Sequence, residues 1–210
     1  MKKFELTNEF ITNMFGTKLF RIRALVEFGD VEAGELGGYV EKESNLGHDD
    51  NAWVYDNAWV YGDAQVSGDA LVYGNARVYG NAWVYGNALV CGDAQVSGDA
   101  LVYDNARVYG DAQVSGDARV YGDARVCGNG DYAYAHGFGS VNRTTTFFRL
   151  KDGGVGVRCG CFYGTLAQFR DKIRETHGES AIAEEYLDLA ALMEKRFRRT
   201  GNEQKTEEES

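Results

Sequence analysis

A six-residue pattern repeats along the middle of this chain and constrains its fold more than any other feature. From residue 52 to residue 127, thirteen consecutive units carry Ala, a variable residue and Val, and Gly or Asp followed by Asn or Asp joins each unit to the next. A period this short is typical of a solenoid, and six-residue units are typical of a parallel β-helix. The pattern therefore predicts a solenoid for this segment.

The unit also predicts how one coil is built. Ala and Val lie two residues apart, so both point to the same side of a short strand, which we expect to be the interior. Gly-Asn or Gly-Asp then turns the corner, because both residue types tolerate tight backbone geometry. Three units make an eighteen-residue triangular coil whose strands pair in parallel with those of its neighbours. We assign residues 47–131 to this β-helix.

The repeats resemble the hexapeptide-repeat family, whose members form left-handed parallel β-helices and usually assemble as trimers. The resemblance implies a left-handed coil and a homotrimer, and the handedness rests on it alone. This chain departs from the family at the residue after Val. The family often has a small or acidic residue there, whereas this chain mostly has Tyr, as at Tyr55, Tyr61, Tyr73 and Tyr79.

Every third unit belongs to the same side of the coil, which defines three outward faces. The first face carries Trp53/Tyr55, Leu71/Tyr73, Leu89/Cys91, Arg107/Tyr109 and Arg125/Cys127. The second carries Trp59/Tyr61, Arg77/Tyr79, Gln95/Ser97 and Gln113/Ser115. The third carries Gln65/Ser67, Trp83/Tyr85, Leu101/Tyr103 and Arg119/Tyr121.

The first and third faces are more apolar than a monomer surface usually is. We expect self-association through eight of their residues, namely Trp53, Leu71, Tyr73, Leu89, Trp83, Tyr85, Leu101 and Tyr103. Terminal segments that fold back over these faces are one alternative, and ligand stacking on the Tyr columns is another.

The segments on either side of the repeats predict caps. Residues 1–46 form an N-terminal β cap, with a strand at 20–26. Residues 132–163 form a junction and a β-hairpin that turns at Asp152-Gly153. Residues 164–199 form a two-helix cap, which begins at a capping box of Thr165 and Gln168. The polar tail, residues 200–210, is expected to be disordered.

Motifs in both caps are similar to those of phage and prophage hexapeptide-repeat proteins. They are the segments 21–25 (Arg-Ile-Arg-Ala-Leu), 37–40 (Gly-Gly-Tyr-Val), 142–148 (Asn-Arg-Thr-Thr-Thr-Phe-Phe), 159–162 (Cys-Gly-Cys-Phe) and 175–178 (Glu-Thr-His-Gly). This resemblance implies a phage-related origin, and hence the cytoplasm of a bacterial host cell.

The composition of the chain argues against several classes of binding partner. The net charge of -10 argues against binding nucleic acid through its phosphates. Residues 1–25 show neither a long apolar run nor a signal cleavage site, and no segment predicts a membrane span. Cys91 and Cys127 should lie two coils apart, roughly 9–10 Å, which exceeds the reach of a disulfide. Free thiols fit a reducing compartment. We predict neither a metal site nor a cofactor.

Three functional hypotheses remain. The first is an acyl-coenzyme A dependent acyltransferase, the common activity of the hexapeptide-repeat family, with His136 as a weak candidate for the general base. The second is a non-catalytic binding protein that sequesters a small anionic, nucleotide-like signal of host defence. Its candidate cradle consists of Ser140, Asn142, Arg143, Thr144, Thr145 and Thr146. The third is a protein-binding inhibitor or a structural scaffold with an acidic surface.

A duplicated block within the repeats helps to choose among these hypotheses. Residues 62–73 recur as residues 92–103, an offset of 30 residues or five units. Since a coil takes three units, the copy falls on a different face. This disfavours a precise site on the repeats and favours one at their ends.

Overall fold

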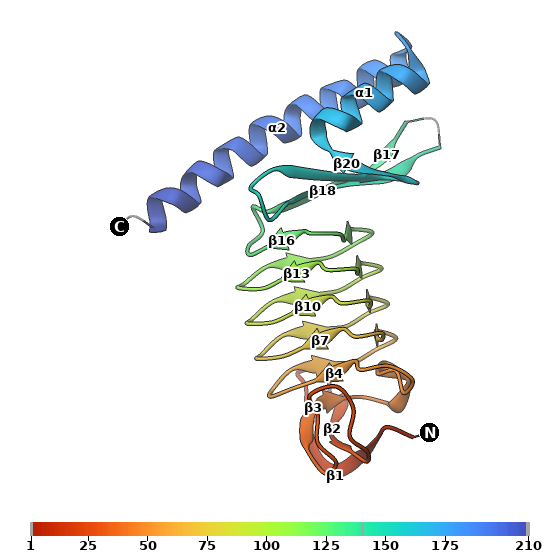
Figure 1. Cartoon of the computed structure of the whole chain (residues 1–210), viewed down its shortest axis with the longest axis vertical. Coiled ribbons are helices and arrows are strands. Elements are labelled where there is room, and N and C mark those ends of the chain that lie inside the picture. The colour runs from red at the N-terminus through yellow and green to blue at the C-terminus, as the bar shows by residue number, and fades with distance from the viewer. Residues whose placement is uncertain (1, 140, 209–210) are drawn as a thin grey trace.

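The computed structural model describes residues 2–139 and 141–208, with side-chain surroundings as far as Thr200. The chain forms a rod with a small sheet at its N-terminal end, a stack of triangular coils in the middle and a sheet with two helices at its C-terminal end (Figure 1). This arrangement confirms the predicted β-solenoid with two caps. No helix in the described part of the chain is long and apolar enough to cross a membrane.

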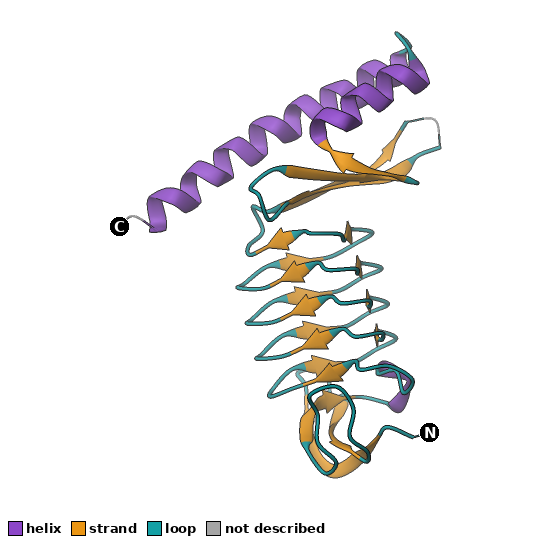
Figure 2. Ribbon diagram, viewed as in Figure 1, coloured by secondary structure: helices purple, strands orange, loops and turns teal. Residues whose placement is uncertain are grey.

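Each hexad contributes one two-residue strand, formed by its variable residue and Val (Figure 2). The strands are β4 (Trp53–Val54), β5 (Trp59–Val60), β6 (Gln65–Val66), β7 (Leu71–Val72), β8 (Arg77–Val78), β9 (Trp83–Val84), β10 (Leu89–Val90), β11 (Gln95–Val96), β12 (Leu101–Val102), β13 (Arg107–Val108), β14 (Gln113–Val114), β15 (Arg119–Val120) and β16 (Arg125–Val126).

These strands stack into three parallel sheets that match the three predicted faces. The first face is the sheet β4-β7-β10-β13-β16, the second contains β5-β8-β11-β14, and the third is β6-β9-β12-β15. Residues eighteen apart are in register, as with Leu71 and Leu89 on the first face and Trp83 and Leu101 on the third. The predicted grouping of hexads by face is therefore confirmed.

Small and branched side chains form most of the solenoid core, and Trp53 and Phe148 join it near its two ends. The Ala and the Val of all thirteen hexads are fully buried. At the corners the backbone turns through a positive φ, for example 68° at Gly68. A Cβ atom at Gly68 would also lie 2.9 Å from the backbone nitrogen of Gly86 in the next coil. Glycine is therefore required there for conformation and for the close approach of coils.

The N-terminal cap is built from β1 (Phe4–Thr12), β2 (Lys18–Ala24), β3 (Leu36–Val40) and the short 3-10 helix η1 (Glu43–Asn45). β1 and β2 pair antiparallel, as do β2 and β3, and β3 pairs in parallel with β5 of the second face. Leu46 forms a parallel bridge with Val66. The first coil thus begins at β3, so the predicted boundary at residue 46 lies too far along the chain. Residues 38–40 are Gly-Tyr-Val instead of Ala-x-Val, so the six-residue pattern did not predict this coil.

Trp53 is not a surface residue, contrary to the predicted interface. Its side chain is fully buried. The rings of Phe4 and Phe28 approach it edge-on, with centroids 6.2 and 5.3 Å from the indole. A Cβ on Gly37 would lie 2.8 Å from the indole ring. The N-terminal cap therefore covers the first residue of the first face.

The C-terminal cap is a four-stranded antiparallel sheet with two helices on its outer side (Figure 1). Its elements are β17 (Tyr132–Phe138), β18 (Arg143–Arg149), β19 (Val155–Cys159), β20 (Phe162–Thr165), α1 (Leu166–His177) and α2 (Ala181–Glu208). The turn between β18 and β19 at Asp152-Gly153 and the capping box of Thr165 and Gln168 are confirmed.

Two features of this cap differ from the prediction. The region 132–163 holds two further strands, β17 and β20, beside the predicted hairpin. Helix α2 continues to Glu208, whereas we expected disorder from Thr200. Residues 203–208 consist mainly of Glu, Gln and Lys, which favour a helix when a packed helix precedes them.

Strand β18 joins the two cores because its side chains alternate. Phe148 packs into the solenoid core, and Phe147 packs with the helices. Successive strand residues point to opposite sides, so one strand can seal the last coil and support the helices above it. Tyr186, Met193 and Phe197 of α2 belong to the second core.

Candidate functional site

The predicted anion cradle does not assemble as one site. Ser140 lies outside the described residues. Thr145 and Thr146 are buried, on opposite sides of β18. The Thr145 hydroxyl donates to the sulfur of Cys159 at 3.2 Å, and the Thr146 hydroxyl accepts from the backbone N–H of Arg119 at 3.0 Å. Both threonines therefore serve the packing of the cap.

The remaining cradle residues lie at the surface but do not converge. Asn142 occupies the turn before β18 with φ 50°. Arg143 extends across the β19–β20 turn, where a Cβ on Gly160 would collide with its guanidinium. The Thr144 hydroxyl is 2.8 Å from Nδ1 of His136. These positions leave Arg143 without the ring of hydroxyl groups that the sequence predicted around an anion.

His136 is exposed on β17 and meets two oxygen atoms through a single ring nitrogen. Its Nδ1 lies 2.8 Å from the Thr144 hydroxyl and 3.7 Å from a carboxylate oxygen of Asp117. A histidine base that a carboxylate orients uses one nitrogen for that carboxylate and the other for the group it deprotonates. Here both neighbours share Nδ1, so the arrangement links β17 to a corner of the solenoid and does not form a relay.

Three tyrosines on the third face form a continuous stack. The ring centroids of Tyr85 and Tyr103 are 4.8 Å apart and those of Tyr103 and Tyr121 are 4.7 Å apart, with interplanar angles of 2° and 16°. Tyr163 of β20 extends the column, with its ring centroid 4.3 Å from that of Tyr121. Each ring face is covered by the next ring, so only edges and hydroxyl groups face outward. A ligand therefore cannot stack on the middle of this column.

The upper end of the column is covered by the C-terminal cap. Tyr121 is buried, and its hydroxyl accepts a hydrogen bond from Arg158 at 3.2 Å. Burial raises the pKa of Tyr121 to about 12, and the guanidinium of Arg158 acts in the opposite direction. The phenol is thus neutral at physiological pH and belongs to the junction between solenoid and cap.

Between the two caps, the apolar residues of the first and third faces are open. Trp83 is 45 % exposed, and Leu71, Leu89 and Leu101 are half-buried. Tyr73 lies beside Cys91, and a hydrogen bond with this thiol, together with burial, raises the pKa of Tyr73. Seven of the eight predicted interface residues are therefore at the surface, and only Trp53 is not.

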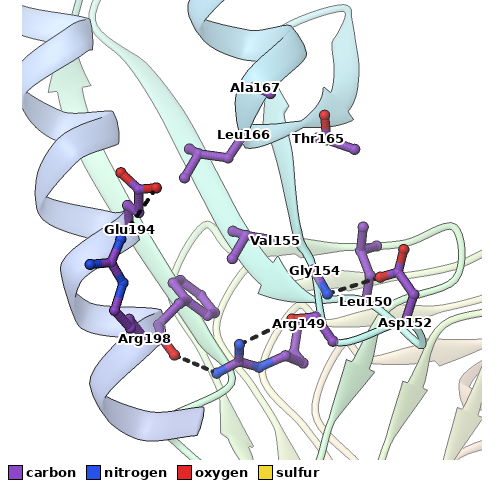
Figure 3. Close-up of a pocket in the computed structure, with 12 residues that line it drawn as sticks. Arg149, Leu150, Asp152, Gly154, Val155, Thr165, Leu166, Ala167, Glu194 and Arg198 are labelled. Atoms are coloured by element: carbon purple, nitrogen blue, oxygen red, sulfur yellow. Dashed lines mark hydrogen bonds and ion pairs between the residues drawn. The ribbon is translucent and has the colours of Figure 1, made fainter. Parts of the chain in front are cut away.

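A cavity of about 360 Å³ lies where α2 passes the β18–β19 turn (Figure 3). Arg149 crosses it, and its guanidinium donates to the carbonyl of Gly153 at 3.3 Å and to that of Phe197 at 2.9 Å. Its Nε also pairs with the buried carboxylate of Asp131 at 3.4 Å. On the helix side, Glu194 pairs with Arg198. These cations are already engaged by protein oxygens, so the cavity is a structural junction rather than an anion site.

Cys91, Cys159 and Cys161 are free thiols. Within the described residues, no group of three or more His, Cys, Asp or Glu side chains is placed to hold a metal ion.

The repeats match a known family. Seven overlapping segments match the family model of the YdcK beta solenoid repeat, at residues 64–80, 72–86, 76–92, 82–98, 94–110, 102–116 and 112–128. The match covers the coils from β6 to β16 and neither cap. No curated protein matches the chain.

Proposed function

Because the repeats of this chain are coils of the YdcK beta-solenoid type, we propose that the protein is a non-catalytic assembly scaffold. Copies associate side by side through the open parts of the first and third faces. The observation that supports this proposal is the apolar stretch between the caps, formed by Leu71 and Leu89 on one face and Trp83 and Leu101 on the other.

The distribution of apolar residues supports association over a free surface. The caps cover the two ends of these faces, at Trp53 and at Tyr121, but leave the middle open. Full burial of a large aliphatic or aromatic side chain contributes about 1.5–3 kcal/mol, so the half-exposed side chains here would each contribute roughly 1 kcal/mol on association. Because the apolar residues recur over several coils and in every copy, these contributions add up across the contact.

The two other hypotheses lose their geometric support. The acyltransferase hypothesis requires a usable base at His136, whose Nδ1 is shared by Thr144 and Asp117. The nucleotide hypothesis requires a cradle that includes Thr145 and Thr146, which are buried. We therefore favour protein–protein contacts over small-molecule chemistry. A trimeric state, a phage origin and a place in the host cytoplasm belong to this proposal and are suggested by the resemblance of the repeats and caps.

The experiment compares the molar mass of three proteins by size-exclusion chromatography with multi-angle light scattering. Leu101→Asp places a charge in the open third face, and Gln95→Asp places the same charge at the equivalent position of the polar second face. We expect the wild type and Gln95→Asp to run as the same oligomer and Leu101→Asp to run as a monomer with an unchanged circular dichroism spectrum. A monomeric wild type at about 100 µM, a concentration that would reveal even a weak complex, would falsify the proposal.

A further inference from the structure

The two ends of the rod carry surfaces of opposite charge, each of which includes exposed apolar residues. At the C-terminal end, a cavity of about 490 Å³ opens between β17 and α2. Its floor is apolar and its rim is basic. The lining residues are Ala133, Leu192, Met193, Lys195, Arg196 and Arg199. We call this the basic groove.

The basic groove is open to a partner. Leu192 is 59 % exposed, which is unusual for a leucine on a helix that packs against a sheet. Lys195 is exposed beside it. Arg196 is held in place because its guanidinium donates to the carbonyl oxygen of Asn129 at 3.0 Å. The groove is therefore pre-formed where the middle of α2 passes β17.

Residues 25–36, which run from the end of β2 to the first residue of β3, carry the opposite charge. It carries the carboxylates of Glu27, Asp30, Glu32 and Glu35 and contains no Lys or Arg. Leu25 and Leu36 at its two ends are 41 % and 47 % exposed. We call this segment the acidic loop. Among the described residues, its carboxylates form no ion pair with another side chain.

The acidic loop is also rigid enough to dock without a large ordering cost. Phe28 and Val31 exchange two backbone hydrogen bonds, at 3.1 and 2.9 Å, and Val31 is buried. The backbone N–H of Ala24 donates to the carbonyl of Glu35 at 2.9 Å. A surface that is ordered before binding loses little conformational entropy on association.

We propose that the basic groove of one copy binds the acidic loop of a second copy, so that rods join end to end. The two surfaces have opposite charges, and both include exposed leucines. They lie at opposite ends of the same molecule. A contact between two different patches at opposite ends of identical rods leaves one unoccupied patch at each end of a pair, so further copies can add in a linear series. This contact is independent of the side-by-side association proposed above.

The first experiment uses sedimentation velocity in a Leu101→Asp background, which removes side-by-side association. We expect the mean sedimentation coefficient to rise with protein concentration at about 50 mM NaCl and to rise much less at about 500 mM, because the contact depends on screened charges. Constant monomer at both salt concentrations up to several hundred micromolar would overturn the proposal.

The second experiment exchanges the charges. One protein carries Lys195→Glu in the groove, and the other carries Glu27→Lys with Glu32→Lys in the loop. Each alone opposes like charges at every contact, so its end-to-end association should weaken roughly ten-fold or more. In an equimolar mixture, each altered surface meets an opposite charge on the other protein, and alternating chains should form again.

Misfolded proteins would not regain end-to-end association when they are mixed. Recovered association therefore shows that the single proteins had lost docking and had not been damaged at either end. The matched control is Lys151→Glu, which reverses an exposed lysine on the β18–β19 turn of the same cap, outside the groove. This variant should associate like its parent. If the mixture stays as dissociated as its two components, or if Lys151→Glu weakens association as much as Lys195→Glu, the assignment of these two surfaces is wrong.

Discussion

Replacement of Trp53 by Ala tests the largest difference between the sequence-based prediction and the structure. Trp53 and Trp83 occupy the same position of their hexads, yet the first is fully buried and the second is 45 % exposed. Trp53→Ala should therefore destabilise the fold and leave the association surface intact. Trp83→Ala should leave the stability of the fold nearly unchanged and weaken association.

The magnitude follows from what surrounds the indole. Truncation of a fully buried Trp costs about 3–5 kcal/mol, because a cavity remains next to Phe4 and Phe28. The indole nitrogen of Trp53 is buried without a hydrogen-bond partner in the described structure. Loss of such an unsatisfied donor returns about 1–3 kcal/mol. The central values, about 4 and about 2 kcal/mol, leave an expected net loss of about 2 kcal/mol in the free energy of unfolding.

The assay is urea denaturation followed by far-ultraviolet circular dichroism, combined with light scattering of the same samples. Trp83→Ala is the matched control and should change the free energy of unfolding of the monomer by less than about 1 kcal/mol, as is typical of surface sites. The reasoning is refuted if Trp53→Ala keeps its stability and loses association, since Trp53 would then be an interface residue after all.

Three further predictions concern the corners, the cap junction and the N-terminal lysine. Gly68→Ala should lower the thermal unfolding midpoint more than Gly153→Ala, because both have positive φ but only Gly68 faces a neighbouring coil; a strained φ alone costs about 1–2 kcal/mol. Thr146→Val should lower the free energy of unfolding by about 1 kcal/mol in chemical denaturation, because the part-buried backbone N–H of Arg119 loses its hydrogen bond. Burial lowers the pKa of Lys3 to about 8 against 10.5 in the unfolded chain. The unfolded state therefore holds more protons above pH 8, so the free energy of unfolding should rise from pH 8 to pH 9.5 in the wild type and stay flatter in Lys3→Met.

Much of the fold was predictable because the hexad is a local pattern with one consistent geometric solution. Ala and Val at a spacing of two must share a side of a strand, and a period of three hexads places residues eighteen apart in register. The pairing of Leu71 with Leu89 follows directly from these two facts. The start of α1 at Thr165 was equally predictable, since a capping box is encoded within four residues.

The candidate site was harder to predict because its residues owe their surroundings to distant segments. Thr145 and Thr146 have the composition of a polar turn, but pairing with β17 and β19 places them inside a sheet. Nothing local to Leu192 or Glu32 indicates that they belong to complementary surfaces at the two ends of the rod. The sequence carried no alternation that would have revealed this, because the four consecutive residues 145–148 are all buried.

By itself, the sequence determined the solenoid, its three faces and the register of its coils, because each of these depends on interactions between neighbouring repeats with the same sequence pattern. Only the tertiary structure decided which parts of those faces are exposed. Trp53 and Tyr121 carry the same local signals as Trp83 and Tyr85, and they are buried because the caps fold over them. Burial is a property of the whole chain, so identical hexads acquire different roles according to their distance from the ends of the rod.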